Sequence, residues 1–318
     1  MNKRLIKIAA IVIAMASGWT AFAQSSEIKP SATYLYMQRD TCSLYMDVYE
    51  PAAGSATQIN GIEKPTVIFM FGGGFIHGTR DDKSYNRWFK DMTDNGYRII
   101  SIDYRLGLKG TNKVGVAQAK VLNKAIHMAV EDLFSATAFI LDNAPELGIS
   151  ADNLVISGSS AGAITVMQAE YELCNRTKWA EVLPRDFNYA GVMSFSGAVF
   201  STKGKVKYKE RPCATLMLHG TADKLVPYKQ IAFFNLGFFG GGKLVERFEK
   251  FGYNYNMYHF LDYGHEVAGS MGTTVDLQCK FLECNVMQKK ERIVEAWISD
   301  PDVYKGSGPQ SRKELYGK

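Results

Sequence analysis

Several features that mark particular classes of protein are missing from this 318-residue sequence. There is no internal repeat and no low-complexity segment, so repeat and fibrous architectures are excluded. The formal net charge is only +5, far from the basic excess of a nucleic-acid-binding domain. The basic stretch 203–211 alternates with other residues, and this charge pattern favours a solvated edge or loop. We expect no nucleic-acid partner.

Cysteine is scarce as well. The chain has five cysteines, at positions Cys42, Cys174, Cys213, Cys279 and Cys284. Their wide spacing excludes a dense disulfide scaffold and resembles no metal site. One or two bridges would be compatible with an oxidising compartment, although Cys279 and Cys284 would point to different faces of the helix expected there.

The N-terminal apolar run is too short to cross a membrane. Residues 8–16 are uninterrupted and apolar, whereas a membrane-spanning helix needs about 20 such residues. Three positive charges precede the run, and Ala21-Phe22-Ala23 supplies the small residues of a cleavage site. We predict that residues 1–23 are a bacterial secretory signal peptide.

Removal of that segment would define the mature protein. Cleavage before Gln24 leaves 24–318, which we predict to be one domain with a loosely ordered polar tail after about residue 300. No cysteine follows the cleavage site, so a lipid anchor is not expected. The prediction is an exported protein, periplasmic or extracellular, with no stable membrane anchor.

What the sequence does contain is a regular alternation of apolar runs and amphipathic stretches. With 46% hydrophobic residues, the chain can bury a large core. Six runs have the length and composition of strands buried on both faces: 66–71, 98–103, 153–158, 190–197, 214–220 and 257–264. Four stretches have helical character: 116–143, 161–173, 243–251 and 273–299. This alternation predicts an α/β fold with a parallel sheet and helices on both faces.

Two earlier runs, 33–39 and 43–50, have strand character and are separated by three polar residues. They predict a hairpin that adds antiparallel strands at one edge of the sheet.

The stretch Gly158-Ser159-Ser160-Ala161-Gly162 fits the template G-x-S-x-G of a nucleophile elbow. A single match in a chain with 29 glycines would also fit an ordinary glycine-rich turn. A strand is expected before the motif and a helix after it, which is the setting that the elbow requires. We therefore predict Ser160 as a nucleophile and Ser159 as a structural residue.

A nucleophilic serine needs backbone donors for the oxyanion that forms during acyl transfer. In the template one donor is the N–H of the residue after the nucleophile, here Ala161, and another comes from a loop after an earlier strand. Residues 71–75, FGGGF, follow the expected strand 66–71. A phosphate-binding loop is the rival interpretation, but neither Gly-Lys-Ser/Thr nor a dinucleotide fingerprint follows.

The general base can be sought by elimination, because the chain has only five histidines and the template places the base after the serine. His77 and His127 come too early in the chain. His219 lies in an apolar run, where a packed histidine is expected, and His259 lies within a strand and is the runner-up. His265 follows a strand in a loop and is our candidate for the base.

The acid that orients the base should lie between the serine and the histidine. Asp223 follows the strand 214–220 by a short turn, which places it at the carboxyl edge of the sheet with the other two groups. A turn-capping role is its alternative. Asp262 is the runner-up, and Asp152 is expected to cap a turn.

These residues carry a resemblance to a known family. The segments FGGGF, SIDYRLG (101–107), SADNLVISGSSAG (150–162), LHGTADKLVP (218–227) and DYGHE (262–266) occur in family order. In them the chain resembles the α/β-hydrolase superfamily, and within it the bacterial carboxylesterases and hormone-sensitive-lipase-like esterases. The resemblance covers most of the mature chain.

The resemblance implies an eight-stranded, mostly parallel sheet and a triad of Ser160, Asp223 and His265. It also implies an oxyanion hole from the N–H groups of Gly73, Gly74 and Ala161, with Gly72 supporting the loop, and no metal or cofactor. One departure affects the loop: Phe71 stands where the family usually has histidine before the glycines.

The resulting hypothesis is an exported serine esterase that acts on small-molecule or carbohydrate esters, with acetyl and feruloyl groups as candidates. A serine peptidase of the same fold and a non-catalytic binding protein are the alternatives. The aromatic stretch 228–256 would either wall the substrate pocket or pack in the core.

Overall fold

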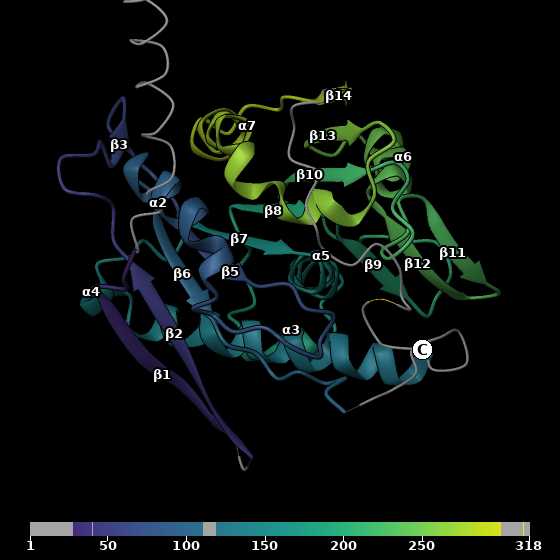
Figure 1. The fold of residues 1–318 in the computed structure, drawn as a ribbon, viewed down its shortest axis with the longest axis horizontal. Helices are drawn as coiled ribbons and strands as arrows, with labels where there is room; N and C mark the ends of the chain where they lie inside the picture. The colour runs from purple at the N-terminus through teal and green to yellow at the C-terminus, as the bar shows by residue number, and fades with distance from the viewer. Residues whose placement is uncertain (1–27, 40, 111–118, 300–313, 315–318) are drawn as a thin grey trace, which may run out of the picture.

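The computed structural model describes residues 28–39, 41–110, 119–299 and 314 of the chain (Figure 1). The predicted signal peptide 1–23 lies outside the described residues. The predicted polar tail also lies outside them, except for residue 314.

A twisted nine-stranded sheet forms the centre of the molecule (Figure 1). Its spatial order is β1 (Ala32–Arg39), β2 (Cys42–Tyr49), β6 (Arg98–Ile102), β5 (Thr66–Met70), β7 (Leu154–Ser159), β8 (Gly191–Phe195), β10 (Ala214–Gly220), β13 (Tyr255–Phe260) and β14 (Val294–Ile298). The pairs β1–β2 and β2–β6 are antiparallel, and every other neighbouring pair in this sheet is parallel. The predicted hairpin and the predicted parallel sheet are both confirmed.

The ninth strand corrects the sequence analysis in two ways. The sheet has one strand more than the eight expected, and β14 lies at the end of 273–299, which had been predicted as one helix. The helical part ends earlier, with α7 (Val275–Phe281) and a π-helical turn, η5 (Leu282–Met287). The Asn285 side chain then donates to the carbonyl of Arg292 at 2.6 Å, which fixes the turn into β14.

Helices cover both faces of the sheet, as expected (Figure 1). In this view α2 (Asn86–Asp94) and α7 lie above it, and α3 (Ala119–Asp142) and α5 (Ala161–Cys174) lie below. A further helix, α6 (Gly241–Phe251), packs against β10 and β13. The remaining elements are short: β3 (Gln58–Ile59), β4 (Ile62–Glu63), η1 (Lys83–Tyr85), α4 (Ala144–Leu147), η3 (Lys178–Val182), β9 (Ala198–Ser201), β11 (Gln230–Phe233), β12 (Leu236–Gly240) and η4 (His265–Thr273).

The core lies on both faces of the central strands. Every residue of β5, β7, β8 and β10 is buried, which explains why these strands have nearly uninterrupted apolar sequences. Their carboxyl ends meet along one edge of the sheet, where ligands gather in open α/β folds. Within the described ranges, no helix is apolar over a length that would cross a bilayer.

All five cysteines lie in the described part of the chain, and all are free thiols.

Candidate active site

Ser160 lies in the sharp turn between β7 and α5. Its backbone has φ +51°, in the left-handed region that a residue with a side chain seldom adopts. The turn is tight because a Cβ on Gly162 would lie 2.0 Å from the carbonyl oxygen of Met70, and one on Gly158 would lie 2.3 Å from the carbonyl carbon of Gly162. The two glycines of the motif are therefore required by close packing, and the strained turn presents the Ser160 hydroxyl at the sheet edge.

The structure brings the three predicted triad residues together. The hydroxyl Oγ of Ser160 lies 2.8 Å from Nε2 of His265, and Nδ1 of His265 lies 2.8 Å from Oδ2 of Asp223. His265 is the first residue of η4 and comes shortly after β13, and Asp223 comes shortly after β10. Since a carboxylate only accepts, Nδ1 of His265 donates to it and Nε2 is left to accept the serine proton.

The carboxylate of Asp223 is buried and fully engaged. Its other oxygen, Oδ1, accepts the N–H groups of Leu225 and Val226, both at 2.9 Å. Burial alone would raise the pKa of Asp223, but hydrogen bonds from His219 and His265 outweigh it and hold the pKa well below its ordinary value. Asp223 is therefore a stable anion that keeps His265 in one orientation.

His219 is a partner of Asp223 that the sequence analysis missed. Its ring is buried, as predicted, but Nε2 lies 3.4 Å from Oδ2 of Asp223 and 3.2 Å from the carbonyl of Val226. Nδ1 accepts the N–H of Gly241 at 3.3 Å, so the proton of the neutral ring is on Nε2. The signal available in the sequence was its position four residues before Asp223, on the same strand end.

The predicted oxyanion loop follows β5 and faces the same cleft as Ser160. Gly73 and Gly74 line that cleft with φ of +114° and +63°, and a Cβ on Gly73 would lie 1.9 Å from the carbonyl oxygen of His77. Ala161 is the first residue of α5, where backbone N–H groups lack an intrahelical acceptor. The three predicted donors thus come from the two segments that border the serine.

Two aromatic side chains hold this loop in place. The N–H of Gly72 donates to the hydroxyl of Tyr85 at 2.9 Å, a contact between distant segments that the sequence analysis missed. Phe71, which stands where the family usually has histidine, is buried and stacks on Tyr104 at 4.4 Å between ring centroids. The hydroxyl of Tyr104 donates to the carbonyl of Phe71 at 2.9 Å. Phe71 therefore anchors the loop by packing.

The other candidates lie elsewhere or have other partners. His259 is stacked on Trp297, and its two ring nitrogens contact Tyr228 at 2.6 Å and Glu295 at 2.9 Å. The carboxylate that contacts His265 belongs to Asp223. Asp262, the runner-up for the acid, donates its backbone N–H to the hydroxyl of Thr221.

The structure also shows where the two remaining histidines and Ser159 lie. His127 contacts Glu172 at 3.0 Å, near the C-terminal end of α5, whereas Ser160 lies at the N-terminal end of that helix. His77 lines the cleft without belonging to the triad. Ser159 donates to the carbonyl of Ala268 at 2.8 Å, in keeping with a structural role.

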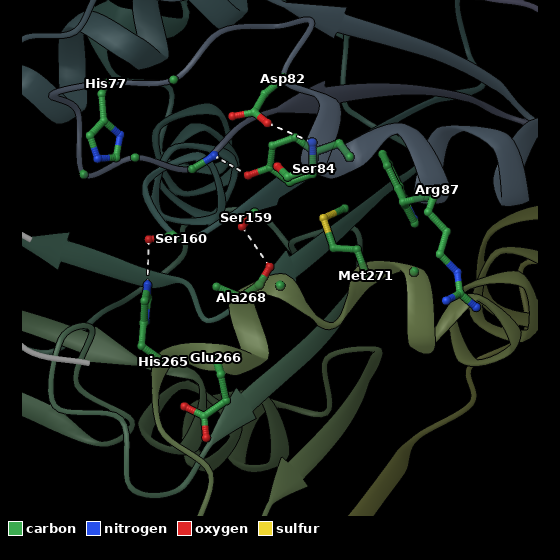
Figure 2. Close-up of a pocket in the computed structure, with 18 of the residues that line it drawn as sticks. His77, Asp82, Ser84, Arg87, Ser159, Ser160, His265, Glu266, Ala268 and Met271 are labelled. Atoms are coloured by element: carbon green, nitrogen blue, oxygen red, sulfur yellow. Dashed lines mark hydrogen bonds between the residues drawn. The ribbon is translucent and has the colours of Figure 1, made fainter. Parts of the chain in front are cut away.

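A cleft of about 540 Å³ opens over Ser160 (Figure 2). This volume lies in the usual range of small-molecule sites, roughly 300–1,000 Å³. Its apolar wall includes Tyr85, Trp88 and Met271, and its polar groups include Arg87, at the far end from Ser160, and Glu266.

No residue of 228–256 lines this cleft. Part of that aromatic stretch packs in the core, as Phe239 and Phe248 do, and part forms the exposed hairpin β11–β12. Of the two alternatives for this stretch, the structure supports packing in the core over a wall of this cleft. Among the described residues there is no cluster of histidine, cysteine, aspartate and glutamate side chains that could hold a metal ion.

Several known proteins match parts of this chain in sequence. The BD-FAE family model matches residues 46–178, which include the glycine loop and Ser160 but neither Asp223 nor His265. Carboxylesterase 5A of Mus musculus is 27% identical over 147 residues, which are 46% of this chain and 23% of that protein. Lipase 1 of Geotrichum candidum is 24% identical over 168 residues, which are 52% of this chain and 27% of that protein. The chain thus spans about a quarter of the length of these two relatives.

Solved structures extend the likeness to the rest of the fold. A thermophilic esterase of Thermogutta terrifontis, with propionate bound, superposes with a TM-score of 0.56 at 18% identity. The superposition covers 81% of this chain and 95% of that one. The same esterase has also been solved after phosphonylation by cyclosarin. The chain therefore has the α/β-hydrolase fold, and its sequence is similar to those of carboxylesterases and lipases.

Proposed function

We propose that this protein is a serine esterase that hydrolyses carboxylic esters through an acyl-enzyme on Ser160. The observation that carries the proposal is the continuous relay from Ser160 through His265 to Asp223, with both distances at 2.8 Å. A serine hydroxyl is a weak nucleophile unless a positioned base removes its proton, and this relay supplies the base and its orienting acid.

In the proposed reaction the Ser160 oxygen attacks the ester carbonyl while Nε2 of His265 takes the hydroxyl proton. The tetrahedral oxyanion accepts hydrogen bonds from the N–H groups of Gly73, Gly74 and Ala161. His265 returns the proton to the leaving alcohol, and the carbon–oxygen bond of the ester breaks. Water then repeats the sequence on the acyl-enzyme and releases the carboxylic acid and the free serine.

The relatives support esters as the substrate class. The curated relatives include carboxylesterases and lipases, and the Thermogutta esterase has been solved with propionate and with butyrate. We extend the proposal to exported activity on acetyl or feruloyl esters of carbohydrates. An aromatic acyl group would contact Trp88 and Met271, and polar groups such as Arg87 and Glu266 would face a hydrated alcohol.

A fluorophosphonate probe tests the nucleophile, because it labels only an activated serine. We expect Ser160→Ala to abolish labelling and to lower hydrolysis of p-nitrophenyl acetate by roughly 10⁴-fold or more. Ser84→Ala is the matched control, since Ser84 lies in the same cleft and is exposed. That variant should label like the parent protein.

Equal labelling of the parent and the Ser160→Ala protein would refute the assignment of Ser160 as the nucleophile. If the parent protein is labelled, parallel assays with acetylated sugars, feruloyl esters and aminoacyl amides then distinguish esterase activity from peptidase activity. Turnover of amides alone would contradict the proposed substrate class.

A further inference from the structure

The hairpin β11–β12 exposes an unusual amount of apolar surface. It stands out from the body at the right of Figure 1 and continues a small sheet with β9. Ile231, Phe233 and Leu236 lie on one face of the hairpin, because Ile231 and Phe233 are two residues apart and Phe233 pairs with Leu236. Their exposed fractions are 43%, 63% and 37%, and that of Phe234 at the tip is 90%.

The tip of the hairpin is also strained. Phe234 and Asn235 form a two-residue turn between the paired residues Phe233 and Leu236, and Phe234 has φ +51°. Such turns favour glycine or asparagine, because a bulky side chain is costly in the left-handed region. A phenylalanine at this position combines backbone strain with nearly complete exposure. Neither property contributes to the stability of the isolated chain.

Positive charge lies beside the same tip and at the base of the hairpin. The N–H of Gly204 donates to the carbonyl of Asn235 at 2.7 Å, so the loop after β9 lies against the turn. This loop carries Lys203 and Lys205, and Lys229 precedes β11; all three are exposed. Within the described residues none of these three lysines forms an ion pair. Their charges are therefore available to an anionic partner.

The chemistry of this surface favours lipid over sugar. Sugars stack on flat aromatic platforms that also offer hydrogen bonds, whereas the rings of Phe233 and Phe234 meet at 79° and carry no polar group. An apolar hairpin flanked by lysines matches a membrane interface, where phenylalanine and leucine enter the acyl boundary and lysines attract anionic headgroups.

We propose that this surface, the hairpin patch, is a docking site for an anionic lipid bilayer. The patch consists of Ile231, Phe233, Phe234 and Leu236 with Lys203, Lys205 and Lys229. It lies shortly after Asp223 and Leu225 in the chain, at the carboxyl edge of the sheet where the cleft opens. Docking would hold the cleft near the bilayer surface without a membrane-spanning segment.

Vesicle binding tests the proposal directly. We expect the protein to co-sediment with vesicles that contain phosphatidylglycerol, far less with pure phosphatidylcholine, and less at high salt. The variant Phe233→Ser with Phe234→Asn should weaken binding at least tenfold. It should melt no lower than the parent protein, because asparagine accepts the left-handed turn. Lys203→Glu with Lys205→Glu should weaken binding by a similar factor and reduce its salt dependence.

A second aromatic and basic pair provides the matched control. Lys250 and Phe251 lie side by side on α6, where Phe251 is 50% exposed, so Lys250→Glu with Phe251→Ser should bind like the parent protein. The N-terminus of each preparation is checked by mass spectrometry, so that variants differ only at the intended sites. Equal binding by parent, patch and control variants overturns the proposal. Patch-dependent binding to an acidic polysaccharide, or patch-dependent dimerisation, without binding to vesicles also overturns it.

Discussion

At the scale of single residues, the candidate site depends on one buried carboxylate that stays ionised. Asp223 is 7% exposed, yet its pKa lies below its ordinary value because four donors surround it: two backbone N–H groups and two histidine rings. A buried charge with this many donors is fixed in place. Its orientation fixes that of His265, and through His265 the hydrogen bond to Ser160.

This environment predicts how stability depends on pH. Because folding lowers the pKa of Asp223, its ionised form stabilises the folded state above the ordinary pKa of 3.8, and this contribution is lost as the pH falls below it. The free energy of unfolding, from urea titrations at about pH 6 and about pH 3, should fall more steeply for the parent protein than for Asp223→Asn. Parallel losses in the two proteins would show that Asp223 is not held as an anion.

The three triad residues could be predicted because the serine motif and the order of the residues along the chain can both be read from the sequence. Gly158-Ser159-Ser160-Ala161-Gly162 identified the serine, and the scarcity of histidine left His265 by elimination. His219 and Tyr85 were missed for a physical reason. Tyr85 acts through its contact with the N–H of Gly72, a pairing that only folding creates. His219 lies four residues before Asp223, but its place in an apolar run predicted only a packed histidine, and the turn after β10 is what brings its ring to that carboxylate.

At the scale of elements, the turn between β7 and α5 is defined by how closely it approaches β5. A side chain on Gly162 would collide with the backbone of Met70, and backbone at that depth has no room to move. The shape of the turn is therefore set by the packing of β5, β7 and α5, and Ser160 lies where they meet.

This contact predicts a difference between two glycines. Gly162→Ala should lower the free energy of unfolding by at least about 2 kcal/mol, because overpacking at a backbone contact cannot relax. Gly269→Ala is the control, since a Cβ there meets nothing within 4 Å. Urea unfolding followed by circular dichroism checks both variants. A Gly162→Ala protein as stable as the control would contradict the close approach.

Elements were predicted well where their hydrophobic period was unambiguous. The fully buried strands of the sheet and the helices α5 and α6 were predicted within a few residues. The end of 273–299 was not, because Val294, Ala296 and Ile298 alternate with Glu295 and Trp297 and fit a strand as well as a helix. Pairing with β13 decided between them, and that partner lies in another part of the chain.

At the scale of the whole molecule, the site exists only when distant strands are assembled. Ser160, Asp223 and His265 follow β7, β10 and β13, and these strands are neighbours or near neighbours in one sheet. The segment matched by the BD-FAE family model ends at residue 178, so Asp223 and His265 lie outside it. Their convergence is a property of the fold.

A site of this kind should be lost only when the sheet is lost. We expect esterase activity and the circular dichroism of the protein to disappear at the same urea concentration, since no triad residue lies on an independently stable unit. Tryptophan fluorescence, to which the buried Trp88 contributes, should follow the same curve. Inactivation at clearly lower urea would show that the loops bearing Asp223 or His265 open before the sheet does.

The left-handed backbone of Ser160 also affects how the protein would respond to laboratory evolution. A library screened for heat tolerance alone would accept glycine at position 160, because glycine adopts the left-handed backbone of this turn without strain. The selected variants would be stable but inactive. Thermostable descendants of this chain therefore have to be sought under a screen that also demands turnover.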